Sequence, residues 1–181
     1  FDGVADAFES FDKLARGYGL GGVHFQYVKI NGDFEKIRKE VGAELTEKEM
    51  LKKLGFSSVT HYQFVHFIDM KNKTYKAAID EMQKEWFECE KLGITYFPHV
   101  SLGWDPNPRF KKYNPDVLID PKPEYVEAAL RLAKEYADAH PNNAPLIVVN
   151  SWNEWTEGSY FEPDDLYGYG YLKAAKSVFV D

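Results

Sequence analysis

The sequence predicts an α/β fold, a (β/α)8 TIM-type barrel of which this chain supplies the C-terminal half in about four βα units. Short apolar runs alternate with longer segments of helical periodicity, and this alternation is typical of βαβ units with a parallel sheet. The distinctive polar and aromatic residues follow the apolar runs, at the face where such barrels carry their functional residues. Four units also permit a small doubly wound domain, but no glycine-rich phosphate loop follows any strand.

The first two units lie in the N-terminal half of the chain. A strand is predicted near residues 22–28, and a short helix is predicted at 47–54. The second strand spans residues 57–62, and its helix runs from about 74 to 92. Apolar residues recur in this helix at helical spacing, and Gly93 is expected to end it as a C-cap.

The last two units lie in the C-terminal half. Strands are predicted at residues 94–100 and 146–150, with a helix at 123–139 between them. This helix has proline near its start, where proline is favoured. A final helix is predicted at about 170–179. No linker or repeat divides the chain, so residues 1–181 are interpreted as a single domain. A half barrel leaves sheet edges open, and we therefore expect the N-terminal half of the barrel to precede Phe1.

Composition excludes several classes of function. The chain carries a net charge of −7 without a basic stripe, so no nucleic-acid partner is expected. Its apolar runs are too short to predict a membrane span. The single Cys89 cannot form an internal disulfide and is interpreted as a small core residue in a helix. No Cys/His cluster has zinc-site spacing, so no metal or cofactor is expected. The compartment stays open between periplasm, extracellular space and cytoplasm.

The most informative motif is N-S-W-N-E-W-T-E-G-S-Y-F-E-P at residues 150–163. It places Glu154 and Glu157 three positions apart, beside Trp152 and Trp155, directly after the fourth predicted strand. Paired carboxyl groups can exchange protons with a glycosidic oxygen and stabilise positive charge at the anomeric carbon. Aromatic faces pack against the C–H face of a pyranose ring. The motif therefore indicates a carbohydrate site, and the alternative is a solvated structural loop.

Further candidate residues stand at the ends of other predicted strands. Tyr62 ends the second strand, and Trp104 follows the third as a stacking platform or a loop-packing residue. Asp105 and Arg109 are interpreted as a pair that clamps this loop, with direct sugar contact as the alternative. Asn153 orients Glu154, binds a sugar hydroxyl or serves as a turn residue. The substrate-binding candidates are Asn153, Trp152, Trp155, Trp104, Asp105, Arg109 and Tyr62.

Four histidines lie on or just after the predicted strands: His24, His61, His66 and His99. Each is interpreted as a hydrogen-bonded interior group rather than as a catalytic group. The best exception is His99, because its strand leads into the Trp104 loop.

The motif W-N-E-W-T-E-G-S-Y-F-E-P, followed by D-D-L-Y-G-Y-G-Y-L, resembles the glycoside hydrolase family 99-like group. That group includes the endo-α-mannosidases and the WbsX-like proteins of polysaccharide gene clusters. Two more pieces are similar to it: L-G-F-S-S-V-T-H-Y, which ends at Tyr62, and G-W-D-P-N-P-R at 103–109. The resemblance covers roughly residues 50 to 180, in the order of the C-terminal half of the barrel.

The resemblance implies a (β/α)8 barrel that binds an oligosaccharide or polysaccharide without a metal. It implies a retaining glycoside hydrolase acting on α-linked, mannose-containing glycans. By the resemblance, Glu154 is the base that deprotonates the sugar 2-hydroxyl, whose oxygen attacks the anomeric carbon and gives a 1,2-anhydro sugar. Glu157 protonates the leaving group and later activates water.

The sequence also departs from the endo-mannosidase pattern. Trp152 stands where those enzymes tend to have phenylalanine, and the motif continues G-S-Y-F-E rather than G-T-x-I-E. Both features favour the WbsX-like branch, whose members are often described as glycosyltransferases. Two alternatives therefore stand beside the hydrolase: a glycosyltransferase of surface-polysaccharide assembly, and a glycan-binding module without catalytic activity.

Overall fold

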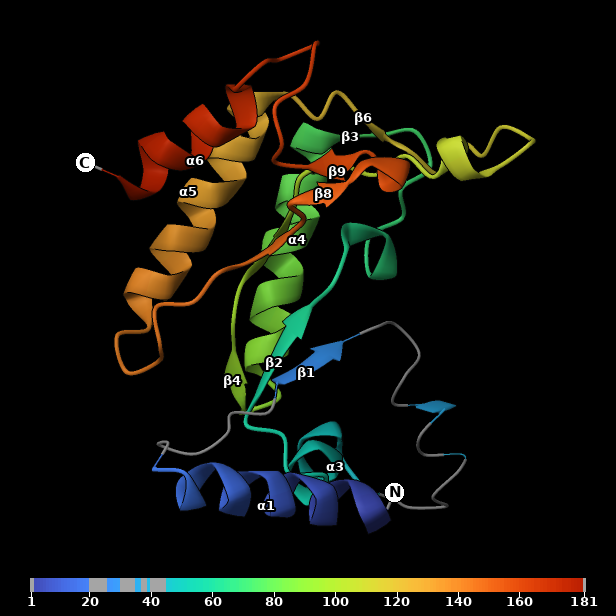
Figure 1. Cartoon of the computed structure of the whole chain (residues 1–181). Coiled ribbons are helices and arrows are strands. Elements are labelled where there is room, and N and C mark those ends of the chain that lie inside the picture. Colours follow the sequence, from blue (N-terminus) through green and yellow to red (C-terminus); the bar gives the residue numbers. More distant parts are fainter. Residues whose placement is uncertain (1, 20–25, 30–34, 37–38, 40–44, 181) are drawn as a thin grey trace.

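The computed structural model describes residues 2–19, 26–29, 35–36, 39 and 45–180. Its helices are α1 (Asp2–Gly17), α3 (Glu47–Lys53), α4 (Tyr75–Glu90), α5 (Pro123–Ala139) and α6 (Gly170–Phe179) (Figure 1). Its strands are β1 (Gln26–Lys29), β2 (Ser58–His61), β3 (Lys73–Thr74), β4 (Thr95–Tyr96), β5 (His99–Ser101), β6 (Leu118–Ile119), β7 (Val148–Asn150), β8 (Asn153–Glu154) and β9 (Ser159–Tyr160). Short 3-10 turns follow three of the strands, at Phe64–His66, Asn107–Arg109 and Trp155–Glu157.

The main strands run parallel and neighbour one another in chain order. β1, β2 and β4 form one parallel sheet, and β5 pairs in parallel with β7. Between β4 and β5, the Phe97 amide still donates to the Val59 carbonyl at 2.9 Å, so the chain stays beside β2. This confirms the predicted strands at 57–62 and 146–150, of which β2 and β7 are the cores. The strand predicted at 94–100 is divided into β4 and β5, which belong to different sheets. Of the first predicted strand, only residues 26–28 lie within the described part of the chain, and they belong to β1.

Successive parallel neighbours are the arrangement that a βα barrel requires. Within the described ranges the strands do not close into a barrel. The (β/α)8 fold class therefore stays a prediction.

The predicted helices are present, and two of them have the predicted bounds. α5 and α6 have the predicted bounds, and α5 starts with Pro123 as its first residue. α4 is shorter than the predicted 74–92 at both ends. Thr74 is its N-cap, where the side chain accepts a hydrogen bond from the Ala77 amide. The prediction that Gly93 is the C-cap is wrong, because the helix ends at Glu90 with Lys91 as its C-cap and Gly93, with a φ of 64°, lies in the turn beyond it. α3 begins with a capping box between Thr46 and Glu49. α1 was not among the predicted helices.

The core lies between α4, α5 and the strands. α4 buries one face, which consists of Tyr75, Ala78, Ile79, Met82, Trp86 and Cys89. The Trp86 ring meets the α5 ring of Tyr136 edge to face at 5.6 Å, and Tyr96 of β4 meets the same ring at 6.0 Å. The confirmed burial of Cys89 agrees with its interpretation as a core residue. Truncation of a buried tryptophan such as Trp86 to alanine costs roughly 3–5 kcal/mol.

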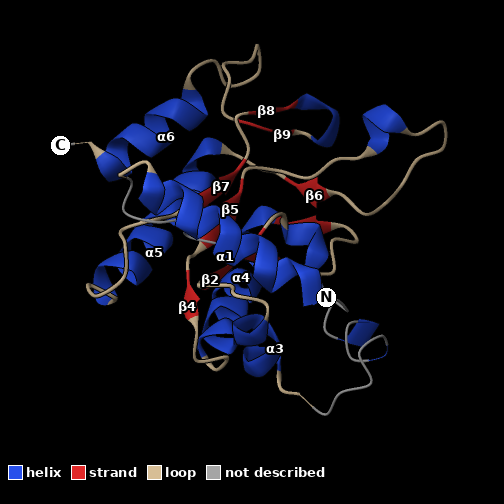
Figure 2. Ribbon diagram, turned by 60° about the horizontal axis from the view of Figure 1, so that its bottom comes forward, coloured by secondary structure: helices blue, strands red, loops and turns tan. Residues whose placement is uncertain are grey.

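The strands point toward the loops that carry the sequence motif. β2 runs away from α1 and α3 and toward the end of the molecule where β8 and β9 lie (Figure 1). β5 and β7 lie side by side, with α5 and α6 to one side of them (Figure 2).

Among the residues that the structure describes, no helix is both long enough and apolar enough to cross a bilayer.

Candidate functional site

A buried polar network ties together the loops that follow β2, β5 and β7. The Gln63 side-chain amide donates to Asn150 Oδ1 at 2.8 Å and to the Gly103 carbonyl at 3.2 Å. Its oxygen accepts from the Phe64 amide at 2.8 Å. Because buried polar groups are costly when unmatched, Gln63 fixes the three strand ends relative to one another. The sequence interpretation missed Gln63 and Asn150. The available signal was a polar amide side chain at the C-terminal end of each of two predicted strands, Asn150 as the last residue of β7 and Gln63 shortly after β2.

The motif after β7 folds back on itself as a small hairpin. β8 pairs with β9 in antiparallel fashion. The Ser151 hydroxyl donates to the Ser159 carbonyl, and the Ser159 hydroxyl donates to the Asn150 carbonyl, both at 2.8 Å. Gly158 has a φ of 62°, which glycine adopts without strain, and it ends the 3-10 turn Trp155–Glu157. The hairpin therefore holds both motif glutamates in a fixed turn.

Glu157 is the buried carboxyl group of the site, with 8% of its surface exposed. Its Oε1 lies 2.9 Å from Arg109 Nη1, and its carbonyl accepts from the Asp105 amide at 2.7 Å. Glu157 Oε2 is buried and has no hydrogen-bond partner among the described residues. The interpretation that Asp105 and Arg109 pair with each other is wrong, because Asp105 Oδ1 instead accepts from the amide and side chain of Asn107.

Arg109 contacts both Glu157 and the ring of Trp104. The guanidinium carbon of Arg109 lies 5.9 Å from the centre of the Trp104 ring, within the range of a cation–π contact. The Trp104 indole Nε1 is buried without a hydrogen-bond partner within the described part of the chain. A donor on Trp104 and an acceptor on Glu157 are thus both unmatched beside one arginine. Such groups in native proteins are commonly matched by a ligand or an ordered water.

Glu154 has different surroundings. It is half-buried, and its Oε1 accepts a hydrogen bond from the Thr156 hydroxyl at 2.6 Å. Its amide donates to the Ser151 hydroxyl at 3.1 Å. Two glutamates of one turn are therefore held by different groups, one by a cation and one by a hydroxyl. Different surroundings allow two neighbouring carboxyl groups to take different chemical roles.

The two motif tryptophans have different contacts. Trp155 stacks on Tyr160 with ring centres 3.8 Å apart, and its Nε1 donates to Glu162 Oε2 at 2.7 Å. Burial, helped by the hydrogen bond to Asp164, raises the pKa of Tyr160 to about 12, so its hydroxyl stays protonated near neutral pH. Trp152 has 57% of its surface exposed. The exposed ring of Trp152 is therefore the more accessible one for a ligand, with exposed Asn153 beside it.

Tyr62 and several histidines lie at or near the ends of the strands. Tyr62 is 46% exposed, and its ring centre lies 5.8 Å from that of His66. His99 is buried, with Nε2 2.9 Å from the Ser101 hydroxyl, which confirms its interpretation as a hydrogen-bonded interior group. Burial lowers the pKa of His99 well below its ordinary value, and the nearby His61 and His66 lower it further. His24 lies outside the described residues.

Comparisons with known proteins place the chain in a family of glycan-related proteins. The family model described as Glycosyltransferase WbsX matches residues 1–175. The chain is 25% identical over 164 residues to a protein called "Uncharacterized protein WxcX" of Xanthomonas campestris pv. campestris strain B100, covering 90% of this chain and 23% of that protein. It is 32% identical over 98 residues to the protein of the same name from strain ATCC 33913, covering 54% of this chain and 14% of the relative.

Proposed function

Because the chain belongs to the WbsX glycosyltransferase family, and so has a glycan-related function, we propose that it is a glycoside hydrolase acting on α-linked, mannose-containing glycans. The observation that carries this proposal is the Glu157 carboxyl group. It is buried, Arg109 holds one of its oxygens, and its other oxygen is unmatched within the described part of the chain. A buried carboxyl group with one unmatched oxygen is suited to proton exchange once a glycan or water reaches that oxygen.

In the proposed reaction the two glutamates divide the work. Glu154 removes the proton of the sugar 2-hydroxyl, and that oxygen attacks the anomeric carbon. The bond from the anomeric carbon to the leaving oxygen breaks as Glu157 protonates that oxygen, giving a 1,2-anhydro sugar. Glu157 then takes a proton from water, and the water oxygen attacks the anomeric carbon. The bond from that carbon to the 2-oxygen breaks, Glu154 returns its proton to the 2-oxygen, and the configuration is retained overall. Arg109 holds Glu157 Oε1, so Oε2 is the oxygen that carries the exchanged proton.

The remaining candidates bind the sugar. Exposed Trp152 offers a flat face for a pyranose ring. The indole N–H of Trp104 is buried and unmatched, so it donates to a sugar hydroxyl only after the side chain moves. Trp155 has a supporting role, because its face is stacked on Tyr160. Asn153 and Tyr62 supply exposed polar groups at the rim, and Asp105 holds the Trp104 loop through Asn107.

A second function, transfer of a sugar from an activated donor, is favoured by the family's own description as a glycosyltransferase. It uses the same residues but needs a sugar-nucleotide or lipid-linked donor. The chain spans less than a quarter of the length of the relatives it matches, so the activity of the whole protein is part of the proposal.

One experiment separates these functions. The longest available form of the protein is incubated with α-mannan and α-linked oligosaccharides in water that carries a heavy oxygen isotope, with and without sugar-nucleotide donors. Mass spectrometry reads the products. The hydrolase gives shortened sugars with one heavy oxygen at the new reducing end, without any donor.

Lengthened sugars that appear only with a donor would show the transferase instead. Retained glycan binding without any product would leave a binding module and overturn both enzymatic functions.

A further inference from the structure

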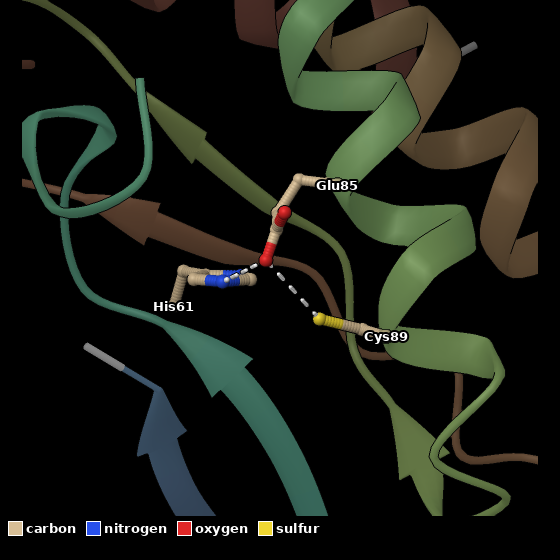
Figure 3. Close-up of side chains that lie close together, drawn as sticks. All are labelled: His61, Glu85 and Cys89. Atoms are coloured by element: carbon tan, nitrogen blue, oxygen red, sulfur yellow. Dashed lines mark hydrogen bonds and ion pairs between the residues drawn. The ribbon is translucent and has the colours of Figure 1, made fainter. Parts of the chain in front are cut away.

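Three potential metal ligands converge between β2 and α4, away from the candidate glycan site. His61 stands at the end of β2, and Glu85 and Cys89 stand on α4. Figure 3 shows their side chains pointing toward one another. His61 Nε2 lies 3.3 Å from Glu85 Oε1, which accepts from Cys89 Sγ at 3.7 Å. All three ligand atoms lie within 4.8 Å of one another.

The local structure places these side chains together for simple geometric reasons. Glu85 and Cys89 are four residues apart on one helix and therefore share a face. His61 is two residues after the core residue Val59, so it projects from the same side of β2, toward α4. A search for Cys/His spacing along the sequence misses this group, because its members come from two elements and one of them is a carboxylate.

We propose that His61, Glu85 and Cys89 bind one Zn²⁺ ion. Imidazole nitrogen, carboxylate oxygen and thiolate sulfur are all zinc ligands, at about 2.0, 2.0 and 2.3 Å. Tetrahedral geometry then sets the nitrogen–oxygen separation at about 3.3 Å and the oxygen–sulfur separation at about 3.5 Å. The structure has 3.3 Å and 3.7 Å for these pairs. The third pair, His61 Nε2 and Cys89 Sγ, lies within 4.8 Å, against about 3.5 Å in the tetrahedral complex, so the side chains shift when the ion enters.

The burial of the three side chains is that of a closed metal site, in which one ligand side chain reaches solvent. His61 and Cys89 are buried, and the Glu85 side chain keeps 20% of its surface exposed. Glu85 therefore marks the route of entry, and a water molecule completes the four ligands. His61 Nδ1 lies 2.9 Å from the Tyr96 hydroxyl. In the tautomer with the proton on Nδ1, this bond orients the ring and turns the Nε2 lone pair toward the ion.

The ion would join the end of β2 to α4. The residue two positions after His61 is Gln63, which holds the loops after β5 and β7. Zinc would thus stiffen the support of the candidate site without taking part in its chemistry. The proposal does not depend on whether the protein is a hydrolase or a transferase.

Titration of the folded, metal-free protein with Co²⁺ tests the proposal through its absorption spectrum. Cys89 is the single cysteine of the sequence, so a cobalt–thiolate charge-transfer band reports on this residue alone. We expect the band to reach its maximum at one cobalt per chain and to disappear when zinc displaces the cobalt. Cys89→Ser abolishes the band, and Glu85→Gln weakens binding by at least about tenfold. Glu88→Gln is the control, because Glu88 lies on the same helix and is paired with Lys91.

Two further measurements distinguish this site from binding at surface carboxylates. Tyr96→Phe removes the hydroxyl that orients His61 and should weaken zinc by roughly 10–100-fold. Zinc affinity should rise with pH, because the ion replaces the Cys89 thiol proton, which leaves to solvent. The absence of a thiolate band in the wild-type protein would overturn the proposal, and this result needs no variant to fold. Equal zinc affinity in wild type and Glu85→Gln would overturn it as well.

Discussion

Glu157 and Arg109 show what residue patterns can and cannot predict. The glutamate pair and its tryptophans were found from the sequence because they lie within one short motif after an apolar strand. The pairing of Arg109 with Glu157 was not found from the sequence, because this ion pair depends on how the loops after β5 and β7 approach each other. For the same reason Asp105, which is nearer to Arg109 in sequence, was taken as the partner of Arg109, although it caps Asn107.

Substitution of the two motif tryptophans should have different effects on stability and on glycan binding. Trp152→Ala should leave the free energy of unfolding within about 0.5 kcal/mol of wild type, because the ring is mostly exposed, while glycan binding weakens by about 1 kcal/mol. Trp155→Ala should cost about 1–2 kcal/mol of stability, because it removes the stack on Tyr160 and the bond to Glu162. Urea unfolding and calorimetric titration with a glycan measure the two quantities. Equal stability of the two variants would contradict the assignment.

Buried His99 should make stability depend on pH. Its folded pKa lies well below 6.5, so in mildly acidic solution the unfolded chain binds a proton that the folded ring does not. The free energy of unfolding should therefore fall as pH drops below 6.5, by up to about 1.4 kcal/mol per pH unit from this group. His99→Gln should remove this part of the slope in urea unfolding between about pH 5 and 7. His140→Gln, at the C-cap of α5, is the control and should keep it. An unchanged slope in His99→Gln would show that the ring does not govern this dependence.

At the scale of elements, the apolar pattern located the helices, and Pro123 as a terminal signal fixed the start of α5, whereas Gly93 did not fix the end of α4. Pro123 marks the start of α5, and the predicted bounds of α5 and α6 match the structure. α1 was missed. Among the residues that the structure describes, Phe8 of α1 meets Phe56 edge to face, while Phe11 and Leu14 are exposed. The tie between the loops after β5 and β7 was not predictable either, because it requires backbone atoms distant in sequence to come close.

The close approach of Gly103 to the Gly158 carbonyl oxygen gives a prediction for the loops after β5 and β7. A Cβ atom at Gly103 would lie 2.1 Å from the Gly158 carbonyl oxygen, which belongs to the backbone and cannot turn away. Gly103→Ala should therefore lower the free energy of unfolding by at least about 1–3 kcal/mol and separate Arg109 from Glu157. Gly17→Ala is the matched control. Its new methyl group meets no described atom within 4 Å, so its stability should change by less than about 1 kcal/mol, measured by urea unfolding. Equal stability of the two variants would contradict the tight contact.

At the scale of the whole molecule, the parallel strands form open sheets that further strands could extend. Among the described residues, β1 pairs with β2 alone and β7 with β5 alone, so one edge of each outer strand lacks a partner. Open edges are a liability that proteins usually cover or pair. We propose that these four parallel units form the C-terminal half of a (β/α)8 barrel in the whole protein. The alternation of strands and helices and the bounds of α5 and α6 were predictable from local patterns, whereas closure depends on strands outside these units.

The most direct test of the central claim is the turnover of an α-linked glycan by matched variants of the longest available form of the protein. Glu154→Gln and Glu157→Gln should each lower turnover by roughly 10²–10⁴-fold while glycan binding is retained, because each removes a group that exchanges a proton in the reaction. Glu162→Gln, in the same motif but bonded to Trp155, should keep most of the turnover. Wild-type turnover in both Glu154→Gln and Glu157→Gln would contradict the assignment of the site.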